Sequence, residues 1–139
     1  MAKIKTKFDS LVKLKQLKIS EIEREILKLN TQISKAQEEL LQLQKEISEV
    51  QFPQQGNFSL ITQFKMMLDA MVNQKNEKQQ QINFLNNQKE ILTNRLKDAN
   101  LEYEKMKYLQ GEEMKKYIQK MKEKESKDMD EIALMLYKG

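Results

Sequence analysis

The chain has 139 residues, a third of them charged, a formal net charge of +4, three glycines, one proline and no cysteine, histidine or tryptophan. So few glycines and prolines leave few places for the backbone to turn, and the apolar residues are mainly Leu, Ile and Met, which helices accept readily. The apolar residues are spread evenly and can bury only a narrow seam between helices, which excludes a large globular core. We therefore expect a single all-α coiled-coil domain over residues 1–139.

The first predicted helix runs from about Lys3 to Val50, and its apolar residues recur at alternating steps of three and four. The repeat is filled at Ile19, Ile22, Ile26, Leu29, Ile33, Ala36, Leu40, Leu43, Ile47 and Val50. An average spacing of 3.5 residues keeps these side chains on one stripe, which is typical of a helix that packs knobs into a partner's holes. Toward the start, Phe8 and Val12 keep the pattern and Lys15 interrupts it.

The predicted connection covers residues 51–57, because Pro53 cannot continue an α-helix and Gly56 permits a backbone conformation that other residues avoid. A second helix is expected over about residues 58–136, with Gly111 as a candidate break. Its seam is predicted at Ile61, Phe64, Leu68, Met71, Lys75, Lys78, Ile82, Leu85, Lys89, Leu92, Leu96, Ala99, Tyr103 and Met106. Three lysines therefore stand in seam positions.

A short connection between two long seams predicts an antiparallel two-helix coiled-coil hairpin. With the turn centred near Gln55, residues whose numbers add to about 110 should face each other. Ile47 should then lie near Phe64, and Phe8 near Tyr103. The second helix should overhang the first, and we expect a monomeric hairpin. A parallel dimer through the first helix is the alternative.

Catalytic groups are scarce in this sequence. Without histidine or cysteine, the chain lacks the commonest general base, the commonest metal ligand and the best nucleophile. None of the three glycines is followed by the Lys-Ser or Lys-Thr pair of a phosphate-binding loop. Adjacent carboxylates, such as Glu38 with Glu39, are read as solvated charges on helix faces. We expect no enzymatic activity and no cofactor.

The positive charge is concentrated in two segments. One is the start, with Lys3, Lys5 and Lys7, and the other runs from Lys105 to Lys127. A hairpin places both at one end, where they could meet an acidic protein surface, phosphates or an anionic membrane face. The alternative is an ordinary solvated, lysine-rich coiled coil.

Nucleic acid is not an expected partner, because the chain has only two arginines and no recognised basic or base-stacking module. No stretch approaches the roughly 18 apolar residues of a membrane span, and no secretory apolar block follows the basic start. These features predict a cytoplasmic protein.

Apolar residues just after the connection are denser than one seam requires. Leu60, Met67 and Val72 lie outside the predicted seam positions. Such a patch indicates a binding site, and methionine suits surfaces that adapt to a partner. The alternative is an apolar cap that closes the hairpin around Phe52.

Two segments carry a resemblance to a known family. The residues Gln63-Phe64-Lys65-Met66-Met67-Leu68-Asp69-Ala70-Met71 and Met129-Asp130-Glu131-Ile132-Ala133 are similar to stretches of the flagellar export protein FliJ family, and length and hairpin plan agree. This family is a cytoplasmic component of bacterial type III export. The second segment favours the flagellar system over the related virulence secretion systems.

The resemblance implies a stalk, similar to the central shaft of rotary ATPases, whose termini enter the hexameric ring of the export ATPase. By motif position, contact with the membrane export gate falls on Phe64, Leu68, Met71 and Lys75, although the last two differ from the family's residues. The expected ring-binding residues are Lys3, Lys5, Lys7, Phe8, Met129, Asp130, Glu131 and Ile132. Export chaperones are further expected partners, and the expected location is peripheral, at the export apparatus of the inner membrane.

Two other classes of function remain open. A prefoldin-like chaperone also uses helical hairpins, but residues 51–61 are too short and too weakly alternating to form its β-strands. A purely structural tether without an ATPase partner would have the same heptads, because a heptad repeat indicates how helices pack and does not indicate the function of the protein.

Overall fold

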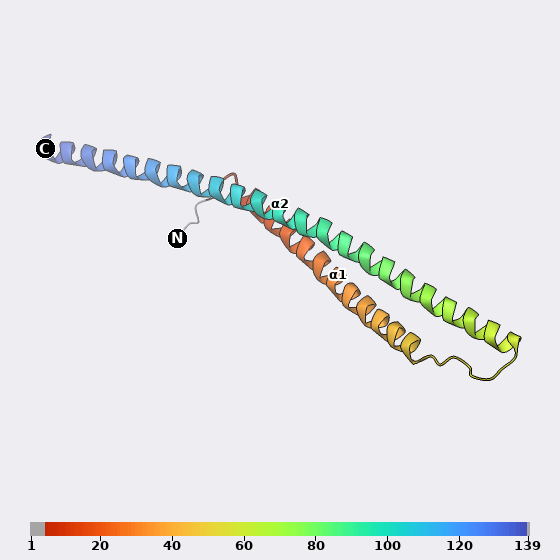
Figure 1. Ribbon diagram of the computed structural model, residues 1–139. Coiled ribbons are helices and arrows are strands. Elements are labelled where there is room, and N and C mark those ends of the chain that lie inside the picture. Colours follow the sequence, from red (N-terminus) through yellow and green to blue (C-terminus); the bar gives the residue numbers. More distant parts are fainter. Residues whose placement is uncertain (1–4, 139) are drawn as a thin grey trace. The chain divides into compact units, whose positions relative to one another are not determined.

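The structure, a computed structural model, describes residues 5–138 and contains two helices, α1 (Asp9–Glu49) and α2 (Phe58–Lys138). The two helices pack against each other in opposite directions and are joined by residues 50–57 (Figure 1). The part of the chain that the structure describes contains no strand. The predicted all-α hairpin is therefore confirmed. Within the same residues, neither helix has the length and apolar character needed to cross a membrane.

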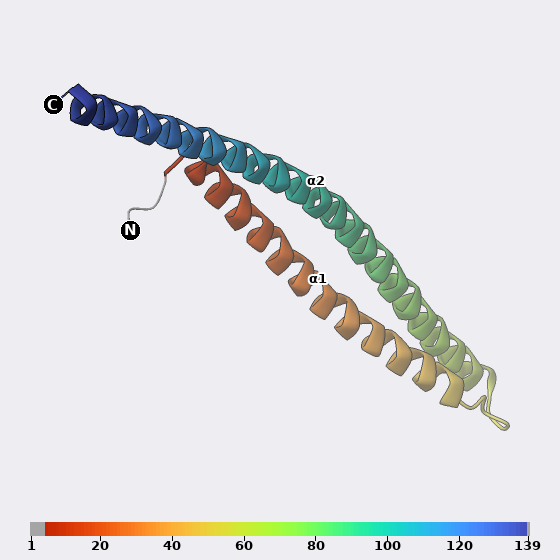
Figure 2. The ribbon, with the colours of Figure 1, turned by 90° about the vertical axis from the view of Figure 1, so that its left-hand side faces the viewer.

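The hairpin divides into two compact units, each of which contains a part of both helices. We call Met1–Glu21 with Lys97–Gly139 the terminal unit, and Ile22–Leu96 the turn unit. In both views of the ribbon, α1 runs alongside α2 (Figures 1 and 2). Each unit therefore has its own segment of buried seam.

The seam follows the predicted heptads closely. In the turn unit, the largest buried cluster consists of Ile33, Ala36, Ile82 and Leu85, with Leu29 and Leu40 packed against it. All ten predicted seam positions of α1 are buried or half-buried. The predicted positions of α2 are buried or half-buried as well, apart from Ile61, which is slightly more exposed. The apolar stripe thus faces the partner helix, as the spacing of 3.5 residues predicts.

The start of α1 differs from the prediction. The helix begins at Asp9 and not near Lys3, which lies outside the described residues. The hydroxyl of Thr6 donates to Asp9 Oδ1 at 2.7 Å, and the Thr6 backbone N–H donates to Asp9 Oδ2 at 3.2 Å. Side-chain contacts of this kind with backbone N–H groups fix the point where a helix starts.

The connection is bounded by two local signals. Pro53 disfavours helical backbone at the residue before it and lacks an N–H, so α1 ends at Glu49. Asn57 starts α2, because its side-chain Oδ1 accepts the backbone N–H of Leu60 at 2.9 Å. Gly56 acts differently from the prediction. No described glycine has a positive φ, but a Cβ at Gly56 would lie 2.5 Å from Leu60 Cδ2, so glycine leaves room for this side chain.

The predicted register is wrong by about one heptad. In the turn unit, Glu39 pairs with Lys78, and in the terminal unit, Lys15 pairs with Glu102, so facing numbers add to about 117. The reason is the non-helical connection. Its backbone advances up to about 3.3 Å per residue against about 1.5 Å in a helix. Residues 50–57 therefore lie beside the first turns of α2, where Phe52 contacts Phe64.

In the terminal unit, α2 continues far beyond its last contacts with α1. It passes through Gly111 without a break, because a single glycine in a helix costs only about 1 kcal/mol. Burial ends at Met114, close to the point where Gln110 bonds to Asp9 at the start of α1. Every residue from Lys115 to Lys138 is exposed. This segment, which we call the tail, is the overhang that the heptads predict.

Candidate functional site

An apolar patch surrounds the connection in the turn unit. Its exposed members are Phe52, Phe58, Leu60, Met66 and Met67. Two of them, Leu60 and Met67, line a shallow groove of about 300 Å³ together with Gln51, Pro53, Gln63 and Phe64. We call these five exposed residues the turn patch. Exposed apolar side chains grouped around a groove are typical of a protein-binding surface.

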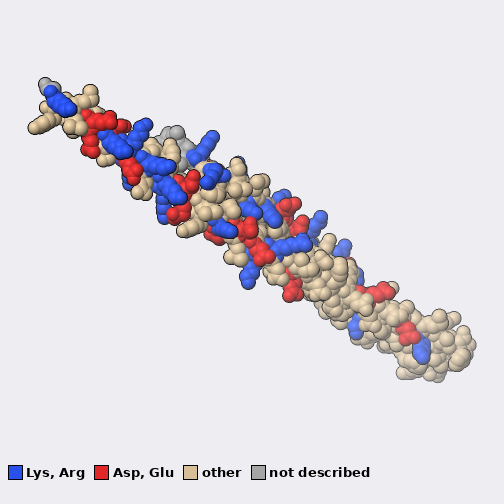
Figure 3. All heavy atoms as spheres, turned by 90° about the horizontal axis from the view of Figure 1, so that it is seen from above, with Lys and Arg blue, Asp and Glu red and all other residues tan. Residues whose placement is uncertain are grey.

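The turn patch has few charges. Lys65 and Asp69 are the only charged residues between Glu49 and Lys75. The space-filling view shows the same contrast on one face of the molecule, where the end that carries the connection is almost entirely uncharged (Figure 3). A partner at this surface must therefore be held mainly by apolar contacts, with Lys65 and Asp69 at hand for polar ones.

The structure places the predicted gate-binding residues mostly inside the seam. Leu68, Met71 and Lys75 are half-buried at positions that face α1. Phe64 is half-buried too, and its ring packs edge-on against Phe52, with ring centroids 5.2 Å apart. The four residues thus lie together along one stripe of α2, but they hold the hairpin closed as well as bordering the patch.

The residues best placed to contact a partner are the neighbours of this stripe. Leu60 and Met67 are 45% and 48% exposed, as expected for positions outside the seam. Met66 is also exposed, although its sequence position gave no separate indication. Phe52, weighed as part of a cap, packs on Phe64 yet remains largely exposed, so the cap and the binding surface share the same side chains.

The tail in the terminal unit is the second candidate surface. Apolar side chains recur along it at Ile118, Met121, Met129, Ile132 and Leu136, interrupted by Glu125. Met129 and Ile132 are 68% and 53% exposed. Asp130 and Glu131, between them, are exposed too. An amphipathic helix face without a partner in the described chain is suited to packing against another protein.

Of the predicted ring-binding residues at the start of the chain, Lys3 lies outside the described residues, and Lys5, Lys7 and Phe8 lie in the terminal unit away from the tail. Lys5 and Lys7 are exposed, and the Lys7 ammonium lies 5.4 Å from the centroid of the half-buried Phe8 ring. The adjacent Asp9 bonds to Gln110. Because an α-helix rises about 1.5 Å per residue, Met129 lies about 28 Å beyond Gln110 along the axis of α2. The structure therefore does not bring the two predicted sets into one cluster, because α2 outruns α1.

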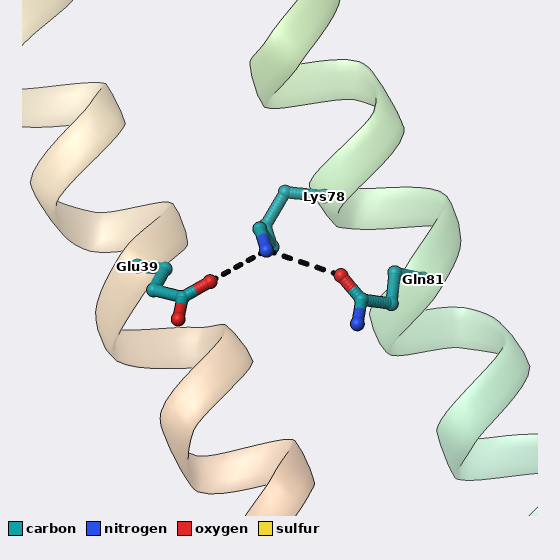
Figure 4. Close-up of polar contacts among 3 residues, drawn as sticks. All are labelled: Glu39, Lys78 and Gln81. Atoms are coloured by element: carbon teal, nitrogen blue, oxygen red, sulfur yellow. Dashed lines mark hydrogen bonds and ion pairs between the residues drawn. The ribbon is translucent and has the colours of Figure 1, made fainter.

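Among the described residues, polar contacts join the two helices near Asp9, Lys15 and Glu39. In the terminal unit, Lys15 Nζ lies 2.9 Å from Glu102, and Gln110 Nε2 donates to Asp9 at 2.8 Å. In the turn unit, Lys78 Nζ donates to Glu39 at 2.5 Å and to Gln81 at 3.1 Å (Figure 4). Two of these contacts give the half-buried seam lysines Lys15 and Lys78 a carboxylate partner.

The carboxylates of these contacts are more acidic than usual. The hydrogen bond from Lys78 lowers the pKa of Glu39, and that from Lys15 lowers the pKa of Glu102. Gln110 and Thr6 lower the pKa of Asp9 in the same way. A lowered pKa means that the ionised form is stabilised by folding, so each pairing weakens when its carboxyl is protonated.

This acidity predicts a pH dependence of stability. Glu39 and Glu102 have folded pKa values below 4.5, so their contributions are complete above about pH 4.5 and are lost as the pH falls through the lower folded values. We expect the melting temperature, followed by circular dichroism, to fall from pH 6 to pH 3. The fall should be smaller in the variant Glu39→Gln/Glu102→Gln. An equal fall in both proteins would contradict the assignment.

The polar groups of the described residues offer no evident metal site, since no three or more carboxylates come together there in a way that could hold an ion. Both candidate surfaces, the turn patch and the tail, present exposed apolar side chains. Their chemistry is that of docking to other proteins.

Comparison with known proteins gives one match. The model of a protein family described as flagellar FliJ protein matches residues 4–139. No curated protein and no solved structure matches the chain.

Proposed function

Because this chain belongs to the flagellar FliJ protein family, we propose that it is a stalk that links the export ATPase ring to the membrane export gate and promotes assembly or activity of the ATPase. Membership makes the protein a non-catalytic component of the flagellar export apparatus, with partners inside that apparatus. The stalk role, the two partners and a peripheral position at the inner membrane are the proposal.

The observation that carries the proposal is the exposed tail. Its residues Met129 and Ile132 present apolar surface on a helix that continues directly from the paired part of α2. Because the preceding part of α2 already supplies the first helical turns, the tail does not require the unfavourable nucleation step of an isolated helical peptide. It is thus ready to pack against an ATPase subunit, with Asp130 and Glu131 supplying charge beside the contact.

The start of the chain adds a second contact in this proposal. Lys5, Lys7 and Phe8, which precede Asp9 and its bond to Gln110, would meet the ring about 28 Å before the Met129 segment along α2, and Lys3 belongs to the same proposed contact. The ring would then be contacted at two levels. Positive side chains at the first level suit an acidic inner surface of the ATPase.

The turn patch is the proposed contact for the gate. Phe64, Leu68, Met71 and Lys75 form the stripe beneath it, and the exposed Leu60 and Met67 extend it outward. A few central, well-packed side chains supply most of the binding energy at protein interfaces, and the proposal assigns that role to these apolar residues. Export chaperones remain further proposed partners.

The test is the ATP hydrolysis rate of the cognate export ATPase, measured with increasing amounts of this protein and alongside ring formation by electron microscopy. We expect a saturable rise in rate with more rings. Met129→Ser/Ile132→Ser should raise the half-maximal concentration at least tenfold, the equivalent of about 1.4 kcal/mol. Leu101→Ser/Tyr108→Ser, which removes exposed apolar residues from the paired part of α2, is the matched control.

An unchanged rate and unchanged ring formation at saturating protein would contradict the stalk role and favour a structural tether. Equal losses in the tail variant and in its control would contradict the assignment to Met129 and Ile132.

A further inference from the structure

Four lysines occupy seam positions where the heptad repeat calls for apolar residues, namely Lys15, Lys75, Lys78 and Lys89, and two of them, Lys15 and Lys78, form ion pairs with the other helix. The side chains of Lys15 and Lys78 are only 27% and 23% exposed. Partial burial of an ammonium group costs free energy, which a paired carboxylate offsets without a large net gain. Lys15 has such a partner in Glu102 of the terminal unit. Lys78 has one in Glu39 of the turn unit (Figure 4). Polar residues kept in a seam at the expense of stability commonly specify how helices pair.

The apolar repeat alone leaves the register ambiguous. Because both seams repeat every seven residues, sliding one helix by a heptad, about 10 Å, again places apolar residues opposite apolar residues. The hairpin model with a turn centred at Gln55 corresponds to such a neighbouring register. Some other feature of the sequence must therefore exclude it.

In the turn unit, the partner of Lys78 distinguishes the registers. A slip by one heptad toward the tight-turn register would replace Glu39 by Gln32, which removes the carboxylate. A slip in the opposite sense would bring Glu46 to the same place. Lys78 thus disfavours the first slip but permits the second.

In the terminal unit, the environment of Lys15 disfavours both slips, including the second slip, which Lys78 permits. The first slip would place Arg95 where Glu102 stands, so that two cations would meet, and the second would place Leu109 there. A half-buried lysine opposite leucine has no counter-charge, which is costly. Of these three registers, only the observed one places a carboxylate beside both Lys15 and Lys78.

We propose that Lys15 and Lys78, through Glu102 and Glu39, select the register in which α1 and α2 pair. The two lysines are positioning residues. They give up stability that apolar side chains would supply, and in exchange they exclude the two neighbouring heptad registers.

Disulfide trapping tests this proposal in the full-length chain, which has no native cysteine. Ala36→Cys combined with Ile82→Cys reports the observed register, since both residues belong to the same buried cluster. Ala36→Cys with Lys75→Cys, or with Lys89→Cys, reports the two slips, because these positions lie one heptad before and after Ile82. With Lys15 and Lys78 intact, the first pair should oxidise at least tenfold faster than the others.

The decisive variant is Lys15→Met/Lys78→Met, which replaces the two paired seam lysines with apolar side chains. We expect this protein to melt at the same or a higher temperature, yet to give slipped disulfides at rates within about threefold of the native pair. A structural role alone would change stability and leave the register unique. Retained tenfold selectivity in the methionine background would overturn the proposal.

A charge exchange supplies the second arm. Lys15→Glu/Lys78→Glu places carboxylates beside Glu102 and Glu39 and should lower the native disulfide yield. Adding Glu39→Lys and Glu102→Lys should restore it. Failure of the exchange to restore the native pair, in a protein that circular dichroism shows to be helical, would also count against register selection by these residues.

Discussion

Replacing Ile82 with alanine is expected to lower the free energy of unfolding by about 3 kcal/mol, because the side chain is 4% exposed in the largest buried cluster. The lost free energy has two parts. One is the favourable burial of the removed apolar atoms, and the other is the cost of the cavity left beside Ala36 and Leu85. The seam is narrow, so few neighbours can move in to fill that space. The measurement is urea unfolding followed by the helical circular dichroism signal.

The matched control is Ile91→Ala on the same helix. Ile91 is 46% exposed, and alanine has the higher helix propensity, so the change should be within about 0.5 kcal/mol. Equal losses at the two positions would mean that Ile82 does not face α1 in solution.

Replacing Leu60 and Met67 with serine is expected to weaken binding to the cytoplasmic part of the export gate tenfold or more, while the melting temperature changes little. Both side chains are about half exposed, so the folded chain loses little packing. Truncating a side chain at the centre of an interface can cost more than about 1 kcal/mol, and about 1.4 kcal/mol in total for the pair is a factor of ten. Binding can be measured by calorimetry with the purified gate domain.

Two further variants make this result specific. Phe64→Ala/Leu68→Ala should weaken gate binding and also lower the melting temperature, because Phe64 packs on Phe52 and Leu68 faces α1. Phe84→Ser/Ile91→Ser, which removes exposed apolar side chains away from the turn patch, should leave binding unchanged. Unchanged binding in the first two double variants would refute the gate contact.

The seam was predictable because periodicity is local information. Ten apolar positions from Ile19 to Val50 were assigned from spacing alone, and all are shielded by the partner helix. The same reasoning placed Leu60 and Met67 outside the seam, where the structure exposes them. Spacing fixes which side of a helix an amino acid occupies, and no other chain segment is needed for that inference.

The register was not predictable from the same pattern. The register depends on the distance that residues 50–57 span, and an extended segment spans more than twice as much length per residue as a helix. The start of α1 was also misplaced, although Thr6 and Asp9 have the spacing of a capping box. The separation of the two ring-binding sets follows from the long tail, which agrees with the predicted overhang of the second helix.

The polar contacts between the helices close chain segments of very different length. Lys78 and Glu39 are 39 residues apart, whereas Gln110 and Asp9 are 101 residues apart. The longer closure costs about 0.8 kcal/mol more conformational entropy. We therefore expect folding to nucleate beside the connection and to zip toward the termini, and unfolding to begin with fraying at Asp9. The end proposed to meet the ATPase is thus the last to form and the first to open.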